Sequence, residues 1–157
     1  CAVEAAEMQF RKLPDLFGRK ALFHDFTNED LRNRGFEAPL FSPSEAAEIL
    51  VNLTNEFRFT LYEHFITDKI GHDQNFDWAR SHLPRVAEFV REVLQKIDLE
   101  NTTVILTSDH GNIEDLSVKT HTTNPALTIT AGLHAKELAE EIKNLTNIKS
   151  TIIKYCT

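Results

Sequence analysis

The sequence predicts an α/β fold in which a mostly parallel sheet is flanked by helices. Two observations carry this prediction. Segments with the hydrophobic period of a helix alternate with short apolar runs typical of buried strands, and recognisable caps begin some of the helices. The 157 residues include only five Gly and five Pro, without an internal repeat or a low-complexity stretch. We therefore expect residues 1–157 to form a single domain without a linker.

The first half of the chain contains two expected helices and one expected strand. Residues 2–12 are rich in helix formers, whereas residues 16–35 have a mixed pattern that predicts no element. A helix start follows at Ser42-Pro43-Ser44-Glu45, where the first serine caps, the proline takes the first helical position and the glutamate completes a capping box. Residues 57–66 are rich in aromatic and β-favouring side chains, which predicts a strand.

Helix and strand signals alternate in the second half. Apolar residues recur at helical spacing between residues 76 and 97, with a restart near Pro84. Residues 103–107, Thr-Val-Ile-Leu-Thr, form a short apolar run of the kind that a buried parallel strand shows. Residues 126–130 are a further candidate strand. Two more helices complete the chain, and we expect Asn147 to cap the last one.

Charge and composition exclude several classes of function. Seventeen Lys and Arg stand against twenty-four Asp and Glu, so the formal net charge is −7, the wrong sign for a protein that neutralises nucleic-acid phosphates or an anionic membrane surface. No apolar run approaches the roughly 18 to 20 residues of a membrane-spanning helix. Two cysteines are too few for a disulfide framework or a cysteine-rich zinc site. We expect no nucleic acid or membrane partner, and a cytoplasmic location.

Three short segments place acid and histidine side chains at or just beyond the ends of expected strands. Asp68 and His72 are four residues apart, a spacing that brings both side chains to one face of a helical turn. Asp109 and His110 directly follow the apolar run and precede a glycine, and as adjacent residues they serve two metals more naturally than one. His121 lies eleven residues later, ahead of the next expected strand. Open α/β sheets bind ligands at this edge.

Together these five residues offer carboxylates and imidazoles, the ligands that suit zinc, manganese or iron. We therefore expect all five to bind metal. The remaining histidines have no partner at ligand spacing, so we expect structural or surface roles for His24, His64, His82 and His134. Glu114 and Asp115 suit either of two roles, orienting a metal ligand or starting a solvated helix.

These segments give the chain a resemblance to the metalloenzyme domain of the alkaline phosphatase superfamily, which includes cofactor-independent phosphoglycerate mutase and phosphopentomutase. Asp68-Lys69-Ile70-Gly71-His72 resembles the family's Asp-x-x-Gly-His element. Ser108-Asp109-His110-Gly111-Asn112 resembles its Asp-His-Gly element, and His121-Thr122-Thr123-Asn124-Pro125 its His-Thr element. The resemblance implies that Asp68, His72 and His121 hold one metal, and that Asp109 and His110 contribute to a second.

The resemblance also implies a reaction. Two divalent ions, zinc or manganese and for the second site also magnesium, would clamp the phosphoryl group of a small phosphate ester for hydrolysis or transfer. No separate organic cofactor is implied. The alternatives are a sulfatase or phosphodiesterase of the same superfamily, and a non-catalytic scaffold or interaction domain that keeps the fold.

One departure from the family concerns the nucleophile. The superfamily takes its Ser or Thr nucleophile and a further metal-binding Asp from a segment after the first strand of its sheet, and we find no such segment here. Ser108 and Thr122 adjoin the ligands, but the family does not use these positions. We therefore expect an incomplete, alkaline-phosphatase-like sheet, with the chain as the carboxyl-terminal part of the metalloenzyme domain. Alone, such a chain would bind one metal well and turn over poorly. Its expected partners are the missing amino-terminal portion or further copies of itself.

Overall fold

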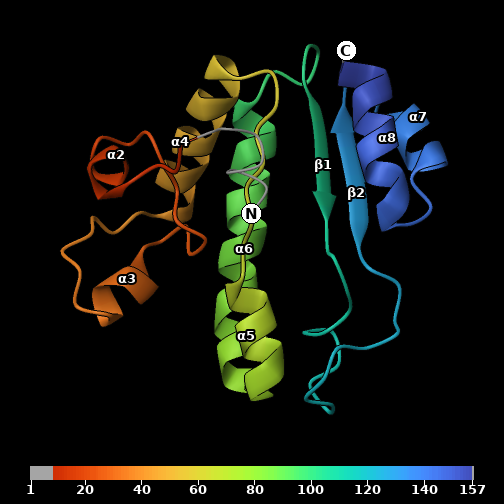
Figure 1. Cartoon of the computed structure of the whole chain (residues 1–157). Coiled ribbons are helices and arrows are strands. Elements are labelled where there is room, and N and C mark those ends of the chain that lie inside the picture. Colours follow the sequence, from red (N-terminus) through yellow and green to blue (C-terminus); the bar gives the residue numbers. More distant parts are fainter. Residues whose placement is uncertain (1–8, 157) are drawn as a thin grey trace.

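The computed structural model describes residues 9–156, which fold into helices on both sides of a two-stranded ribbon (Figure 1). In chain order the elements are α2 (Leu13–Phe17), α3 (Glu29–Asn33), α4 (Pro43–Glu56), α5 (Ile66–Asp73), α6 (Phe76–Lys96), β1 (Thr103–Thr107), β2 (Thr128–Gly132), α7 (Ala135–Glu141) and α8 (Leu145–Cys156). The expected first helix is not confirmed. Its residues 2–8 lie outside the described residues, and 9–12 are not helical.

The capping box predicted at Ser42 is confirmed and begins α4. The Ser42 hydroxyl accepts a hydrogen bond from the Glu45 amide at 3.2 Å, and the Glu45 carboxylate accepts one from the Ser42 amide at 2.9 Å. These bonds satisfy amides that have no partner within the first helical turn. The start of α4 is thereby fixed, and its buried residues Ala46, Ala47 and Ile49 belong to the main hydrophobic core.

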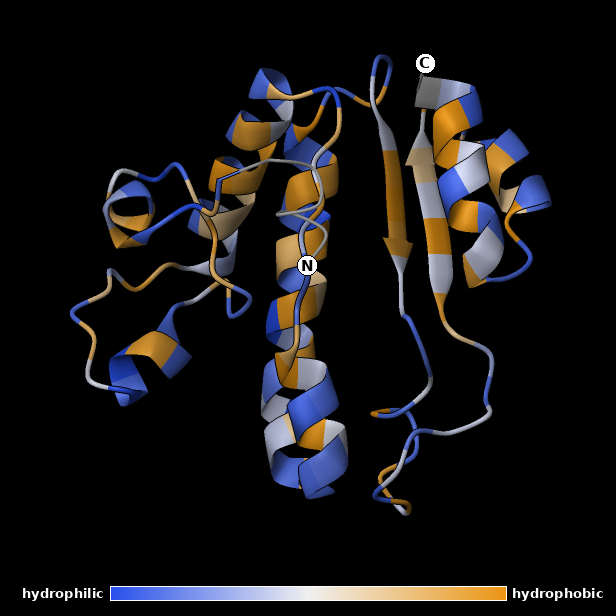
Figure 2. Cartoon of the chain, in the orientation of Figure 1, coloured by the Kyte–Doolittle hydropathy of each residue, from blue (hydrophilic) through white to orange (hydrophobic). Residues whose placement is uncertain are grey.

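Helix α6 is the central element of the fold. It begins where Asn75 Oδ1 accepts a hydrogen bond from the Trp78 amide at 2.9 Å, and it continues through Pro84 without the expected restart. Phe89 and Val93 on α6 share the main core with α4. Figure 2 shows apolar residues in orange along both helices, whereas α5 and the loop after β1 are mostly blue and white. The main core therefore lies between α4 and α6, and α5 lies at the more polar end of the molecule.

The expected mostly parallel sheet is not confirmed. Strands β1 and β2 pair antiparallel, with Thr103 opposite Gly132 and Thr107 opposite Thr128. The physical reason lies in the connection, because a parallel pair needs a crossover, usually a helix, and residues 108–127 contain none. β2 lies two residues later than the predicted 126–130. Among residues 9–156 this pair is the whole sheet.

Gly132 ends β2, and Asn144 precedes the start of α8. Gly132 at the end of β2 has φ +81°, and a Cβ there would collide with the Thr102 carbonyl oxygen, so only glycine suits this position. The cap of α8 is Asn144 in place of the predicted Asn147. Its Oδ1 accepts from the Thr146 amide at 3.0 Å and from the Thr146 hydroxyl at 2.6 Å.

The strand predicted at residues 57–66 is also not confirmed, since 57–65 are irregular and Ile66 begins α5. The segment still has the two-residue alternation of a strand. Tyr62 faces inward, with its ring 5.7 Å from that of Phe89 on α6, whereas Phe59 and Leu61 are exposed. No described strand pairs with this segment, so it lacks the ladder that defines a strand.

The segment at 16–35, for which no element was predicted, packs around a fully buried Phe26. This ring stacks on Phe89, with centroids 4.5 Å apart. The buried Asp25 carboxylate accepts hydrogen bonds from the amide and hydroxyl of Thr27 and from the Asp30 amide, at 2.8 to 3.2 Å. These local bonds compensate for the burial of a charge. They hold together a turn that hydrophobic periodicity alone does not reveal.

Candidate metal centre

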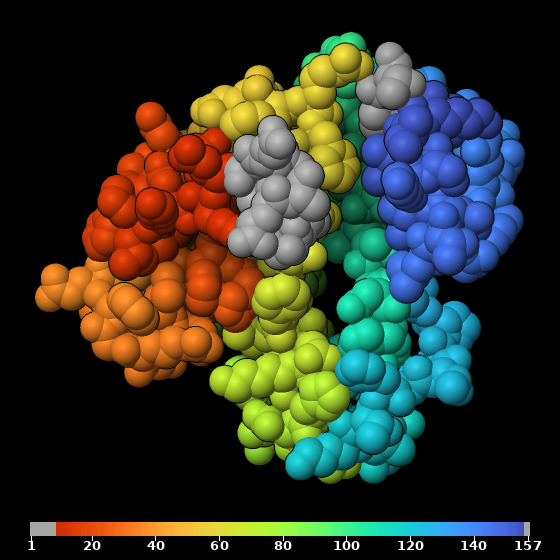
Figure 3. Space-filling model, viewed as in Figure 1, coloured from red at the N-terminus to blue at the C-terminus, as the bar shows by residue number. Residues whose placement is uncertain are grey.

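All five predicted site residues meet at the polar end of the molecule. Helix α5 carries Asp68 and His72 four residues apart on one face. Ser108 separates β1 from Asp109 and His110, and His121 lies further along the connection from β1 to β2. Figure 3 shows the α5 surface and this connection in contact at one end of the molecule. At this contact, Ile113 and Leu116 of the connection pack against a small apolar cluster of Ile66, Ile70 and Ala79.

Asp68, His72 and His121 form the tightest group of possible ligand atoms. Asp68 Oδ1 lies 3.4 Å from His72 Nε2 and 3.5 Å from His121 Nε2, and the two Nε2 atoms are 3.2 Å apart. An ion held tetrahedrally at about 2.0 to 2.1 Å separates its ligand atoms from each other by about 3.3 Å. One cation therefore fits among these three side chains with little movement.

The hydrogen bonds around this group fix the tautomer of His72 and join His72 to His121. His72 Nδ1 lies 2.8 Å from the Lys119 carbonyl oxygen, which only accepts, so Nδ1 carries the proton. In the neutral ring Nε2 then accepts the hydrogen bond from His121 Nε2 at 3.2 Å, and a cation shared by the two rings would replace that bond. Asp68 Oδ1 is inaccessible to solvent and accepts no hydrogen bond. A buried carboxylate oxygen without a donor is costly, and a metal ion would compensate it.

The adjacent pair Asp109 and His110 lies beside this group. His110 Nε2 is 3.4 Å from Asp109 Oδ2 and 3.9 Å from Asp68 Oδ1, and its ring stacks on that of His121 with centroids 3.5 Å apart. Asp68, His110 and His121 also offer ligand atoms within 4.8 Å of one another. The group with His72 is more compact and matches one ion better. Asp109 has a side chain that is 79% exposed, so its carboxylate is open to further ligands.

The two hydroxyls next to the ligands are occupied. Ser108 Oγ donates to the His110 carbonyl oxygen at 2.6 Å, and Thr122 Oγ1 donates to the Glu114 carboxylate. Both hydroxyls therefore hold the backbone of the connection.

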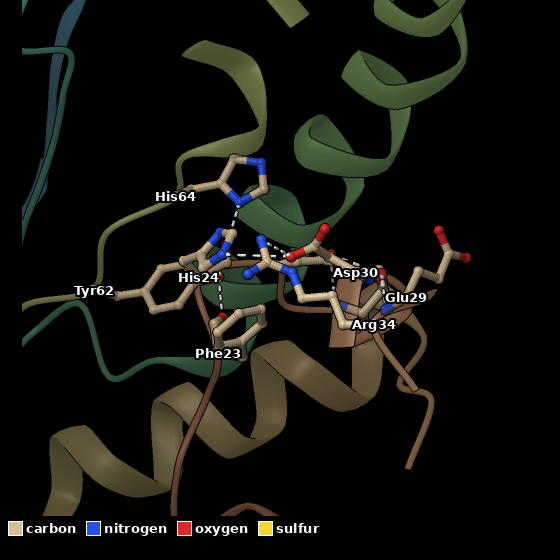
Figure 4. A network of polar contacts seen from close by, with 9 residues as sticks. Phe23, His24, Glu29, Asp30, Arg34, Tyr62 and His64 are labelled. Atoms are coloured by element: carbon tan, nitrogen blue, oxygen red, sulfur yellow. Dashed lines mark hydrogen bonds and ion pairs between the residues drawn. The ribbon is translucent and has the colours of Figure 1, made fainter. Parts of the chain in front are cut away.

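Three of the four remaining histidines lie together in a second cluster that spacing did not predict. Figure 4 shows His24 and His64 beside Tyr62, with Asp30 and Arg34 paired at 2.8 Å. His64 Nδ1 donates to the His24 carbonyl oxygen at 2.6 Å, and its Nε2 lies 2.9 Å from His82 Nε2. Burial lowers the pKa of His64, and it lowers the pKa of His82 to about 4. The hydrogen bonds join the segment before α3, the segment before α5 and α6, and the structural role expected of these histidines stays a prediction.

Sequence reasoning missed Asn112, a buried residue that packs against Gly71 next to His72. The glycine of the Asp-x-x-Gly-His element was the available signal, because a glycine inside a helix often marks a close approach.

No helix among the described residues is long and apolar enough to cross a membrane.

Comparison with known proteins places the chain in a family. A family model described as the Metalloenzyme superfamily matches residues 3–157. The chain is similar to proteins named 2,3-bisphosphoglycerate-independent phosphoglycerate mutase. The one from Gracilaria tenuistipitata var. liui is 26% identical over 127 residues, 74% of this chain and 25% of that protein. The one from Clostridium botulinum is 31% identical over 94 residues, 55% of this chain and 18% of that protein.

A third relative, from Mycoplasma pneumoniae, is 25% identical over 124 residues, 75% of this chain and 24% of that protein. The chain thus spans about a quarter of the length of the curated relatives that it matches over most of its own length. No solved structure matches it significantly. Because the family model matches nearly every residue, the chain belongs to the Metalloenzyme superfamily, of the alkaline phosphatase-like kind, and the similarity to phosphoglycerate mutases supports this assignment.

Proposed function

We propose that this chain carries the metal-binding part of a two-metal phosphatase or phosphomutase-like enzyme that acts on phosphate esters. The observation that carries the proposal is the set of 3.2 to 3.5 Å separations among Asp68 Oδ1, His72 Nε2 and His121 Nε2. Its first metal is zinc or manganese, because two imidazoles and a carboxylate suit these ions.

Asp109 and His110 supply part of a second metal site in this proposal. The exposed Asp109 carboxylate faces solvent and is available for an ion that needs further oxygen ligands, such as manganese, zinc or magnesium. We found no nucleophile segment in the sequence, so the chain on its own turns over poorly. It binds one metal well, because only the first site has three ligands on this chain. The single domain at 1–157 and the cytoplasmic location stay predictions. Both suit an enzyme of small metabolites.

The chemistry assigns each side chain a task. Bound divalent ions polarise a phosphoryl group and lower the pKa of an attacking hydroxyl or water. Asp68 supplies the negative charge of the first site. His72, held by its Nδ1 hydrogen bond to Lys119, keeps Nε2 aimed inward, and His121 brings the connection after β1 to α5. The names of the relatives favour phosphoryl transfer within a phosphate ester over simple hydrolysis.

Calorimetric titration with Zn²⁺ and Mn²⁺ tests the proposal. We expect one tight site in the unaltered chain and its loss in Asp68→Ala and His72→Ala. Asp73→Ala is the matched control, because it removes a carboxylate from the same helix outside the compact group. Circular dichroism would show that each variant folds. Undiminished binding in Asp68→Ala and His72→Ala would contradict the proposal.

Activity distinguishes an enzyme from a scaffold. A residual metal-dependent hydrolysis of an aryl phosphate that disappears in Asp109→Asn would support catalysis. A chain without such activity that nonetheless binds a protein partner tightly would favour the non-catalytic alternative.

A further inference from the structure

Glu114 is the most heavily bonded carboxylate on the connection between β1 and β2. Its Oε2 accepts a hydrogen bond from the Asn112 amide at 2.6 Å. Its Oε1 accepts one from the Thr122 hydroxyl and one from Asn124 Nδ2, the latter at 3.0 Å. Both oxygens are therefore engaged, so Glu114 acts through its neighbours.

The donors belong to the two turns that carry imidazoles. Asn112 lies two residues after His110, and Thr122 directly follows His121. The same turns meet in an isolated bridge, where the Thr122 amide donates to the Gly111 carbonyl oxygen at 2.9 Å. A Cβ on Gly111 would collide with Thr122 Oγ1 and would lie 2.6 Å from Glu114 Oε1. Glycine thus permits the close approach, and Glu114 bonds to both sides of it.

Asn112 extends this arrangement to α5. Its side chain packs against Gly71, the residue before His72. A carboxylate that fixes the Asn112 backbone therefore also fixes the position of the connection along α5. The nearby hydrogen bonds from His72 to Lys119 and from Gln74 to the Leu116 carbonyl oxygen at 3.1 Å act in the same direction.

Glu114 stays ionised at neutral pH. The hydrogen bond from Thr122, with others from Asn124 and Asn112, lowers the pKa of Glu114 to about 2. A carboxylate that stays ionised makes stronger hydrogen bonds than a neutral acceptor does. Its neighbour Asp115 differs, since the Asp115 carboxylate accepts from the amide and hydroxyl of Ser117 within its own turn.

We infer that Glu114 is a positioning residue that holds the His110 turn and the His121 turn together at the spacing that the metal centre needs. The inference rests on the proposed function, because the centre is the one proposed above. It also decides between the two sequence interpretations of Glu114 and Asp115, with only Glu114 supporting the ligands.

Calorimetric titration of the full chain with Zn²⁺ tests the inference in Glu114→Gln and Glu114→Ala. Substituting a residue that orients a metal ligand typically lowers metal affinity by about 10- to 100-fold, and we expect a loss of that size in both variants. Asp115→Asn is the matched control and should bind as the unaltered chain does. Thr122→Val should weaken binding, whereas Thr122→Ser, which keeps the hydroxyl, should retain it.

A second measurement separates this inference from the proposed function. Nuclear Overhauser contacts between the His110 and His121 rings, recorded in the metal-free protein, should be present in the unaltered chain and lost in Glu114→Ala. If the unaltered chain binds no zinc, the proposed function fails, and ring contacts retained in Glu114→Ala and Thr122→Val would then overturn the positioning role as well. If the unaltered chain binds zinc and these variants bind it equally tightly, the inference alone is overturned.

Discussion

The side chain of Asn112 occupies the space beside the α-carbon of Gly71. A Cβ at position 71 would overlap Asn112 Oδ1 and lie 2.9 Å from its Nδ2. Gly71 is buried in the last turn of α5, where alanine would otherwise be the better helix former. The contact joins the helix that carries Asp68 to the loop that carries His110, so a glycine is required where two parts of the candidate metal centre meet.

Gly71→Ala should therefore destabilise the protein. Overpacking typically costs about 1 to 3 kcal/mol, which outweighs the roughly 1 kcal/mol that alanine gains over glycine in a helix. Urea unfolding of the metal-free protein measures the difference. The double variant Gly71→Ala, Asn112→Ala removes the colliding amide and should recover part of the loss. Equal stability of Gly71→Ala and the unaltered chain would show that Asn112 moves aside freely.

The histidine pair predicts a pH dependence of stability. His64 donates through Nδ1, so His82 Nε2 donates to His64 Nε2, and both rings are neutral. Burial, and next the neighbouring His64, lower the pKa of His82 to about 4, against about 6.5 in an unfolded chain. Between these values the unfolded chain binds a proton that the native state does not. Stability is therefore retained above about pH 6.5 and lost as the pH falls toward 4.

The full pKa difference of His82 corresponds to about 3 kcal/mol. Urea unfolding at pH 7 and pH 5, with a chelator present, measures the loss, and His82→Gln is the comparison because its amide keeps a donor without titrating. The variant should lose less stability than the unaltered chain between the two pH values. Equal losses in both proteins would mean that His82 does not carry this dependence.

The extended segment before α5 predicts association. Phe59 and Leu61 are 58% and 69% exposed, and no described strand pairs with their segment. An extended segment outside the sheet that exposes apolar side chains favours contact with another chain. Light scattering should give a mass above that of the monomer, and Phe59→Ser with Leu61→Ser should lower it. Leu40→Ser, at a residue of similar exposure elsewhere, is the control. A monodisperse monomer would contradict this prediction.

Local signals in the sequence predicted the two long helices α4 and α6, but not α2, α3 or α5. The capping box at Ser42 needs only four neighbouring residues, and the apolar stripe of α6 repeats over several turns, so both were readable without knowledge of the fold. The strand β1 was likewise visible as a short apolar run. Each of these features depends on residues that are close together in the chain.

Features that depend on distant partners were not predicted. Residues 57–65 have the composition and alternation of a strand, but a strand also needs a neighbour, and no described strand supplies one. The direction of the β1–β2 pair follows from a connection without a helix, which the apolar runs do not reveal. His64 and His82 are 18 residues apart, a separation that no periodic pattern links.

The candidate site lies between these cases. The four-residue spacing of Asp68 and His72 and the adjacent Asp109 and His110 pointed to side chains that could converge, and the structure brings all five residues together. Their role as metal ligands stays a prediction. The motif glycine hinted at the close contact with Asn112, and Glu114 had two open roles. Their actual partners were not predicted, because these contacts cross from one turn to another at the close backbone approach of Gly111.

Anomalous diffraction from a crystal of the zinc-loaded protein tests the central claim most directly. We expect a zinc peak about 2.0 to 2.2 Å from Asp68 Oδ1, His72 Nε2 and His121 Nε2. A zinc ion bound elsewhere, with these three atoms left without metal, would contradict the account.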